Sequence, residues 1–349
     1  MKNLRWKILG LMLFGVCVCT SAGTYWFQKN ISTPMNIGAN GHAVVVERGT
    51  TLASIAARLH KENIIRVPQA MVLYARFTDQ ARRIQAGEYR ILPGTTPTDF
   101  INLLVAGSVQ QFPVTFIEGW NFSTLRSALA QQSRLGQHIT NMTDQQVMAA
   151  LGMRGVSPEG RFFPDTYLYI AASTDLALLH RSASKMTDFL KLAWPKRAKE
   201  LPYSEVDEAL VMASIIEKET GAASERRQIA GVFVRRLRLG MRLQSDPTVI
   251  FGMADQYKGN ISRTDLKRHT PYNTYRINGL PPTPIALPGK ASIEAALHPA
   301  AGKALYFVGK GDGSHYFSAT LAEHRKAVEL YQRSGRRKDY RSSPTTGPQ

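Results

Sequence analysis

The chain has 349 residues, 44% of them hydrophobic and 20% charged, a composition that excludes a disordered chain and is typical of roughly two or three folded domains. Lysine and arginine outnumber aspartate and glutamate by 44 to 26, which gives a formal net charge of +18. So basic a chain favours an anionic neighbour such as nucleic acid, a lipid headgroup surface or an acidic wall polymer.

The first thirty residues carry a membrane anchor or an export signal. Lys2, Arg5 and Lys7 precede an apolar segment at 8–27, which is long enough as a helix to cross a hydrocarbon layer of about 30 Å. The basic residues keep the N-terminus in the cytoplasm. We expect an anchor over residues 1–28, and a signal peptide cleaved near Ser21 is the alternative. Both place the bulk of the chain outside the cytoplasm, which argues against a nucleic-acid partner.

The cysteines, histidines and glycines of the sequence do not form a recognisable metal-binding or cofactor-binding motif. Cys17 and Cys19 both lie inside the apolar segment, so the exported part has no disulfide and no cysteine-bound metal. The histidines follow no common ligand spacing, and no glycine-rich phosphate-binding loop is present. We therefore predict neither a metal nor a cofactor.

A short linker and a small α+β module are expected to follow the anchor. Residues 29–41 are polar and predict the linker, and 42–108 alternate between strand and helix patterns. The module's expected elements are a strand at 43–46, a helix at 52–59, a helix at 68–77, a strand at 86–91 and a helix at 97–104. Such a module binds glycan or positions its neighbour, and fold-level analogy does not decide between them.

A mainly helical domain with strand and loop insertions is predicted over 109–332, followed by a disordered basic tail at 333–349. Proline and glycine interrupt it at 162–165 and 279–289, and long ordered loops of this kind often carry function. The expected helices are 144–151, 175–194, 204–220, 223–239 and 291–296.

Glu219 is the strongest candidate for chemistry. Met212, Ile216 and Glu219 follow the i, i+4, i+7 spacing of one helix face, so this carboxyl group projects from the apolar side of its helix. Loss of solvation disfavours the charged form and raises the pKa of a carboxyl group. Glu219 can then hold a proton near neutral pH, as a general acid requires.

Two alternatives to this interpretation remain. A buried glutamate can be structural and pair with an arginine, and Arg226, Arg235 and Arg242 are near enough in sequence. Glu217 can instead supply the acid, or the second carboxylate of a hydrolase. Residues two apart on a helix point about 200° apart, which argues against Glu217 and Glu219 facing one substrate.

Several longer motifs together resemble the YceG-like family of endolytic murein transglycosylases (MltG type). The resemblance extends from the anchor to His324. The motifs are EGRFFPDTY at 159–167, ASIIEKET at 213–220, VFVRRL at 232–237, GMRLQSDPTVIFG at 240–252, YNTY at 272–275, GLPPTPI at 279–285 and HPA at 298–300.

The resemblance implies an α+β protein with one inner-membrane span, a cytoplasmic N-terminus, a LysM-like module at 42–108 and a periplasmic catalytic domain. It implies cleavage of the β-1,4 bond between N-acetylmuramic acid and N-acetylglucosamine in nascent strands, which terminates elongation, and an association with peptidoglycan synthases (penicillin-binding proteins). The family's catalytic glutamate is the second in the Glu-Lys-Glu-Thr motif and corresponds to Glu219.

One carboxyl group suffices for this chemistry, because the muramyl 6-hydroxyl replaces the water that other glycosidases activate with a second carboxylate. A non-catalytic glycan-binding scaffold for wall synthases is the alternative function. In a transglycosylase, polar and aromatic side chains in the irregular motifs are expected to contact sugar, although each can instead cap a turn or pack in the core. These candidates are Glu217, Gln244, Asp246, Tyr272, Asn273, Tyr275 and His315.

Overall fold

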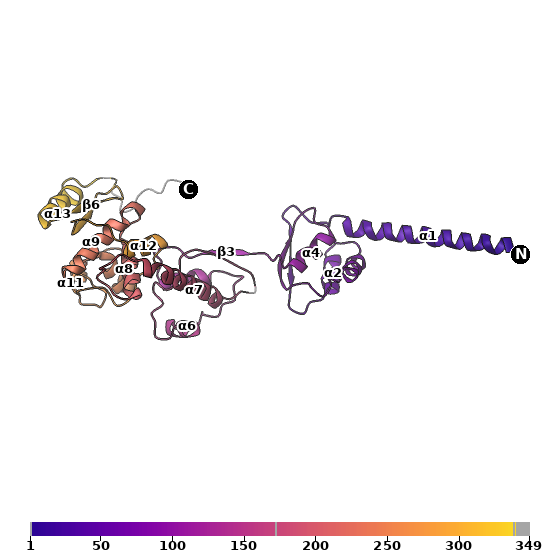
Figure 1. Ribbon diagram of the computed structural model, residues 1–349, viewed down its shortest axis with the longest axis horizontal. Coiled ribbons are helices and arrows are strands. Elements are labelled where there is room, and N and C mark those ends of the chain that lie inside the picture. Colours follow the sequence, from indigo (N-terminus) through magenta and orange to yellow (C-terminus); the bar gives the residue numbers. More distant parts are fainter. Residues whose placement is uncertain (1, 172, 338, 340–349) are drawn as a thin grey trace. The chain divides into compact units, whose positions relative to one another are not determined.

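The chain forms two compact units, which we describe separately. The computed structural model describes residues 2–171, 173–337 and 339 (Figure 1), so most of the predicted tail lies outside the described residues. The first unit spans Met1–Phe112 with Leu168–Ala172, and the second spans Pro113–Tyr167 with Ser173–Gln349.

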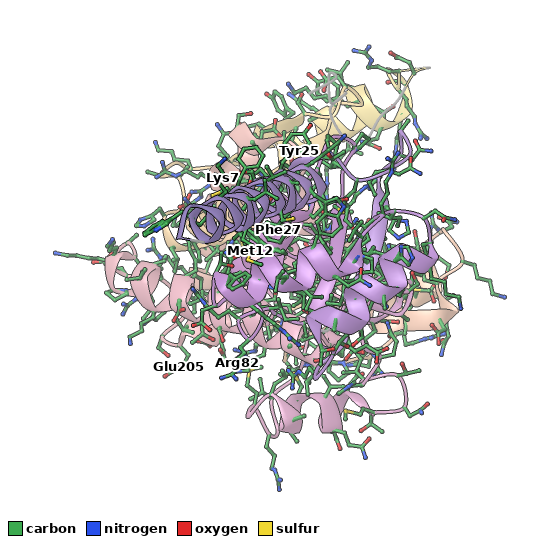
Figure 2. All side chains as sticks on the ribbon, turned by 90° about the vertical axis from the view of Figure 1, so that its right-hand side faces the viewer. Lys7, Met12, Tyr25, Phe27, Arg82 and Glu205 are labelled. Atoms are coloured by element: carbon green, nitrogen blue, oxygen red, sulfur yellow. The ribbon has the colours of Figure 1, made fainter. Side chains whose placement is uncertain are left out.

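Helix α1 (Lys2–Ser32) contains the predicted anchor. It contains the stretch Gly10–Ser32, and among the described residues this is the one helix long and apolar enough to cross a membrane. Figure 2 looks along α1 and shows side chains such as Met12 and Tyr25 pointing away from its axis. Length and composition of this kind fit a membrane span or an export signal.

Residues 29–41 do not form the free linker that the sequence predicts. Helix α1 continues to Ser32, and the side chains of Ile31 and Met35 are buried. The hydroxyl of Thr98 donates to the carbonyl of Ile31 (2.7 Å), and the amide of Met35 donates to the carbonyl of Thr95 (2.9 Å). The segment is polar on average, but two of its apolar side chains, Ile31 and Met35, pack into the first unit.

The first unit is built in the order strand, helix, helix, strand, helix. Strands β1 and β2 pair antiparallel with Val44 opposite Tyr89, and the ring of Tyr89 packs edge-on against Phe100 at 6.4 Å between centroids. Thr51 and Thr96 cap the helices that follow them. The elements are β1 (His42–Val46), α2 (Leu52–Lys61), α3 (Pro68–Phe77), β2 (Gly87–Ile91) and α4 (Pro97–Ala106).

The second unit is mainly helical. Strand β3 (Phe112–Thr115) pairs with β4 (Thr166–Tyr169), and each of these two strands contains a point at which the chain passes from one unit to the other. Strands β5 and β6 form a second two-stranded sheet. The other elements of the second unit are α5 (Phe122–Ala130), α6 (Asp144–Ala150), α7 (Asp175–Ala193), α8 (Val206–Glu219), α9 (Arg226–Arg238), α10 (Asp246–Met253), α11 (Arg263–Lys267), α12 (Lys290–Leu297), β5 (Tyr306–Gly309), β6 (His315–Ser318) and α13 (Leu321–Val328).

Helix α8 lies at the centre of the second unit. Every residue from 209 to 216 is buried, and the helix packs against α9, α10 and α12. Close packing of α9 depends on Gly231, because a Cβ atom there would lie 2.3 Å from the carbonyl oxygen of Ala300. The buried part of α8 is thereby held in a close-packed core, and Glu219 follows it at the end of the helix.

Candidate active site

Glu219 ends α8, and its partly buried carboxyl group accepts a hydrogen bond from the hydroxyl of Ser245. Burial raises the pKa of Glu219 from an ordinary value of 4.5 to about 7. The Ser245 hydrogen bond lowers this pKa, the charge of Asp246 raises it, and the positive charge of Arg236 lowers it. Near neutral pH the group is therefore able both to give and to accept a proton.

Ser245 is held by a buried hydroxyl network. Its amide donates to the Oγ1 of Thr274 (2.9 Å), and its carbonyl accepts from the hydroxyl of Thr248 (2.7 Å). The hydroxyls of Thr248 and Thr274 lie 2.8 Å apart, and all three residues are buried. The network fixes the hydroxyl of Ser245 toward Glu219.

Arg236 is the cation that acts on Glu219. It is buried, its Nε donates to the carbonyl of Leu305 (2.6 Å), and its Nη1 donates to that of Leu243 (2.7 Å). The guanidinium group also lies 5.2 Å from the ring centroid of Tyr306. Carbonyl groups accept the hydrogen bonds of the guanidinium group and an aromatic ring packs against it. The charge of Arg236 therefore acts on Glu219 from a distance and not through an ion pair.

The three arginines suggested from sequence as structural partners of Glu219 contact other groups. Arg226 lies 3.7 Å from the carboxylate of Glu217. Arg235 donates to the carbonyl of Ala304 (2.7 Å). Arg242 donates to the carbonyl of Tyr275 (3.1 Å). Within the described part of the chain, none of the three forms an ion pair with Glu219.

Gln244, Asp246 and Tyr275 belong to the segments around Glu219. The hydroxyl of Tyr275 donates to Oδ1 of Asp246 (2.6 Å), and burial raises the pKa of Tyr275 above its ordinary range. Gln244 has a φ of +52°, which is rare for a residue with a side chain, and its side chain is exposed. Its amide donates to the carbonyl of Thr274 (3.1 Å), so the strained turn is anchored beside Ser245.

Glu217 has different neighbours from Glu219, as the angle between them on the helix predicts. Its Oε2 accepts from the amide of Gly289 (2.9 Å), and its Oε1 lies 3.7 Å from Arg226. A Cβ atom at Gly289 would lie 1.9 Å from Oε1 of Glu118, so the end of this glutamate side chain would have to shift. These contacts give Glu217 a structural role at the start of α12.

Tyr272 and Asn273 hold the loop together. Asn273 is buried, and its Nδ2 donates to the carbonyls of Asp265, Leu266 and Arg268 at 3.1, 3.2 and 2.6 Å. Tyr272 packs against Phe251 at 4.8 Å between ring centroids, and its hydroxyl lies 2.8 Å from that of Thr283. Oδ1 of Asn273 accepts from the amide of Tyr275 (3.0 Å), so both ends of the buried Asn273 amide are bonded to backbone.

His315 is paired with Glu225. Its Nδ1 lies 2.7 Å from Oε2 of Glu225, its amide donates to Oε1 (2.9 Å), and its ring packs edge-on against Phe307. These contacts fix the β5–β6 hairpin against the segment that precedes α9. Among the residues that the structure describes, no group of three or more His, Cys, Asp and Glu side chains is arranged to hold a metal ion.

Sequence patterns did not identify Ser245 or Arg236 as functional residues, and they gave Glu159 no definite role. Ser245 lies between two named candidates but is too common a residue type to stand out, and Arg236 is one of many basic residues. Glu159 accepts the amide hydrogen of Phe122 at the start of α5 (3.1 Å), and burial raises its pKa to about 7. Glu159 therefore caps a helix, as its turn position allows.

The structure places one carboxyl group with a pKa near neutrality, Glu219, at the end of α8. The chain belongs to the YceG-like family, whose model matches residues 44–330. It is 32% identical over 321 residues to an endolytic murein transglycosylase of Bacillus subtilis, a match that covers 87% of this chain and 86% of that protein.

Two further similarities agree with this assignment. An endolytic murein transglycosylase of Streptococcus pneumoniae is 24% identical over 362 residues, which cover 92% of this chain and 64% of that longer protein. A crystal structure of a YceG-like protein from Listeria monocytogenes aligns with a TM-score of 0.52 and 28% identity, over 83% of this chain and 99% of that one. Both the sequence and the fold therefore resemble the family along most of the chain.

Proposed function

We propose that this protein is a membrane-anchored endolytic lytic transglycosylase, which cleaves the β-1,4 bond between N-acetylmuramic acid and N-acetylglucosamine in nascent peptidoglycan. The observation that carries the proposal is Glu219, a carboxyl group with a pKa of about 7 at the end of a rigid helix. The names of the relatives from Bacillus subtilis and Streptococcus pneumoniae support the same reaction.

Glu219 serves first as acid and then as base. Its proton passes to the glycosidic oxygen as the bond to the muramyl anomeric carbon breaks, and the resulting carboxylate then takes the proton of the muramyl 6-hydroxyl. That oxygen attacks its own anomeric carbon and closes a 1,6-anhydro ring. The proton returns to Glu219, no water is consumed, and the second carboxylate of a hydrolase is not required.

The surrounding residues are assigned to substrate binding. Gln244 and Asp246 offer an amide and a carboxylate for sugar hydroxyl or acetamido groups, and Tyr275 adds a ring face beside them. We assign the first unit, with its strand–helix–helix–strand order, as a LysM-like module that binds or positions the glycan. Helix α1 anchors the enzyme in the inner membrane with the catalytic unit in the periplasm, next to the synthases that make the strand.

The test compares the full-length protein with Glu219→Gln, in detergent, on uncrosslinked glycan strands. Products are identified by mass spectrometry, and Asp255→Asn, an exposed carboxyl-to-amide change, serves as control. We expect anhydro-ended fragments from the wild type and the control, and none from Glu219→Gln.

Two other results would replace the proposal. Fragments with reducing ends would mean a hydrolase, and Asp246, whose charge acts on Glu219, would then be the second carboxylate to test. Intact strands that remain bound to the wild-type protein would favour the non-catalytic scaffold.

A further inference from the structure

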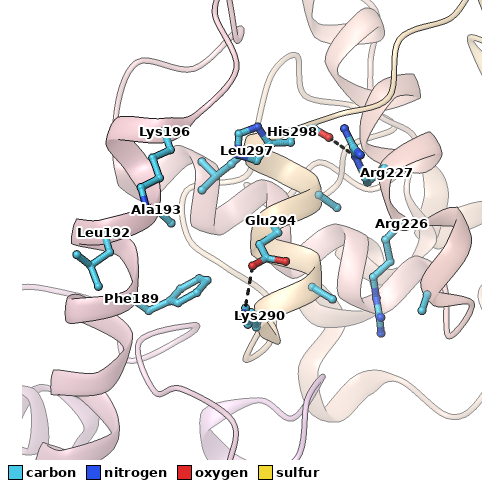
Figure 3. Close-up of a pocket in the computed structure, with 13 residues that line it drawn as sticks. Phe189, Leu192, Ala193, Lys196, Arg226, Arg227, Lys290, Glu294, Leu297 and His298 are labelled. Atoms are coloured by element: carbon cyan, nitrogen blue, oxygen red, sulfur yellow. Dashed lines mark hydrogen bonds and ion pairs between the residues drawn. The ribbon is translucent and has the colours of Figure 1, made fainter.

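A pocket of about 700 Å³ lies in the second unit, and the Glu219 site contributes no residue to it. Figure 3 shows α12 between two walls, with Phe189, Leu192 and Lys196 on one side and Arg226 and Arg227 on the other. Seven apolar residues line the pocket, and four of them are alanines. The alanines are Ala193, Ala223, Ala291 and Ala295, and the larger residues are Phe189, Leu192 and Leu297.

The pocket has an excess of positive charge. Lys196, Arg226, Arg227 and Lys290 line it, against a single acidic residue, Glu294. Glu294 lies 3.7 Å from Lys290, which neutralises both. Arg227 is oriented by a hydrogen bond from its Nε to the carbonyl of His298 (2.8 Å). Within the described residues, neither Lys196 nor Arg227 forms an ion pair, and both are exposed. These two cations are available to an anionic ligand.

Arg226 connects this pocket to the last turn of α8. It contacts Glu217 at 3.7 Å, and its Nε is buried without a hydrogen-bond acceptor. Glu217 and Glu219 lie two residues apart on α8, so Arg226 links the pocket to the helical turn that carries Glu219.

We propose that the pocket binds the stem peptide of the peptidoglycan strand that Glu219 cleaves, an inference that rests on the proposed function. A stem of about five residues, extended at roughly 3.3–3.6 Å per residue, spans about 17 Å, which exceeds the width of about 10–12 Å of a helix with its side chains. Its alanine methyl groups match the alanine-rich lining, and its carboxylates match Lys196 and Arg227.

The size of the pocket favours a short peptide over an acidic helix of a partner protein. A volume of about 700 Å³ is typical of sites that enclose a small ligand, whereas a protein partner of ordinary affinity buries about 800 Å² on each side. Binding of the stem gives the enzyme a means to distinguish strands that carry peptides from strands that have lost them.

The test uses the full-length protein in detergent with two substrates, uncrosslinked strands that carry stems and the same strands after an amidase has removed them. We expect wild-type kcat/KM to be higher for the stem-bearing strands. The double variant Lys196→Gln/Arg227→Gln is expected to lose roughly fivefold in kcat/KM on these strands, the effect of two exposed charged contacts, and to keep the wild-type rate on stripped strands. Lys258→Gln/Lys303→Gln removes the same charge from exposed positions outside the pocket.

Binding of a free synthetic stem pentapeptide, followed by fluorescence, gives a readout that needs no cleavage. If the wild-type protein binds the peptide and the double variant does not, the pocket is a stem-peptide site. If the wild type in addition cleaves neither substrate, the proposed function is refuted while the pocket assignment stands. Equal rates on the two substrates, with peptide binding unchanged in the double variant, would overturn the stem-peptide proposal and favour an acidic protein segment as the occupant.

Discussion

Ser245 donates its hydroxyl hydrogen to Oε1 of Glu219, and so links the residue that precedes α10 to the last residue of α8. The bond stabilises the ionised carboxylate and lowers the pKa of Glu219, against the larger effect of burial. The resulting pKa of about 7 is suited to a group that has to act as acid and base in one catalytic cycle.

Ser245→Ala is expected to raise the pKa of Glu219. The acid has to be protonated to begin the reaction, so kcat/KM falls as the pH rises past this pKa. Loss of a hydrogen bond to a charged group moves that fall to higher pH by about one unit. The pH dependence of kcat/KM on glycan strands measures the shift, and the exposed Ser184→Ala serves as control. An unchanged profile would mean that Ser245 does not act on Glu219.

Asp246→Asn is expected to shift the same profile in the opposite direction. The negative charge of Asp246 raises the pKa of Glu219, so the neutral amide lowers it and the loss of activity begins at lower pH. The hydroxyl of Tyr275 keeps an acceptor in the amide oxygen, which preserves the loop. An anhydro product from this variant would also exclude Asp246 as an essential second carboxylate, whereas an unchanged pH profile would contradict its effect on the pKa of Glu219.

The sequence predicted the centre of the second unit well because its signals are local. The apolar pattern before Glu219 predicts a buried helix, and the structure has one at Val206–Glu219. The angle between Glu217 and Glu219 likewise follows from helix geometry alone.

A local signal is also present in the first unit. The helix over Pro68–Phe77 begins at a proline, which marks its first turn in the sequence.

Features that depend on distant contacts could not be predicted in this way. The roles of Ser245 and Arg236 arise from segments that meet only in the folded chain. Asn273 suits a sugar by its chemistry, but its amide is used by three backbone carbonyls. The segment at 29–41 is polar on average, yet Ile31 and Met35 are buried. Residue type indicates what a side chain is able to bind, and the fold determines what it does bind.

Glu219→Gln is expected to stabilise the protein at alkaline pH while it abolishes cleavage. The folded-state pKa of about 7 lies above the ordinary value of 4.5, so the folded state binds this proton more tightly than the unfolded state. The associated stability is fully present below pH 4.5 and is lost as the pH rises through 7. Glutamine does not ionise and avoids that loss, which amounts to about 3 kcal/mol at most.

Urea denaturation of the two proteins at pH 4.5 and pH 8.5 checks this expectation. The free energies of unfolding should be similar at the lower pH, and the variant should be more stable at the higher one. Glu159, whose pKa is also raised to about 7, contributes equally to both proteins and cancels in the comparison. A difference that does not grow with pH would contradict the raised pKa of Glu219.

Asn273→Ala is expected to destabilise the second unit without removing a sugar contact. Three carbonyls at the end of α11 lose their donor, and unsatisfied buried groups of this kind cost about 2 kcal/mol in total. Thermal unfolding should show a lower Tm, whereas KM for glycan strands should stay close to that of the wild type below the transition. The exposed Asn260→Ala is the matched control. A raised KM with an unchanged Tm would instead make Asn273 a sugar ligand, as its chemistry alone predicts.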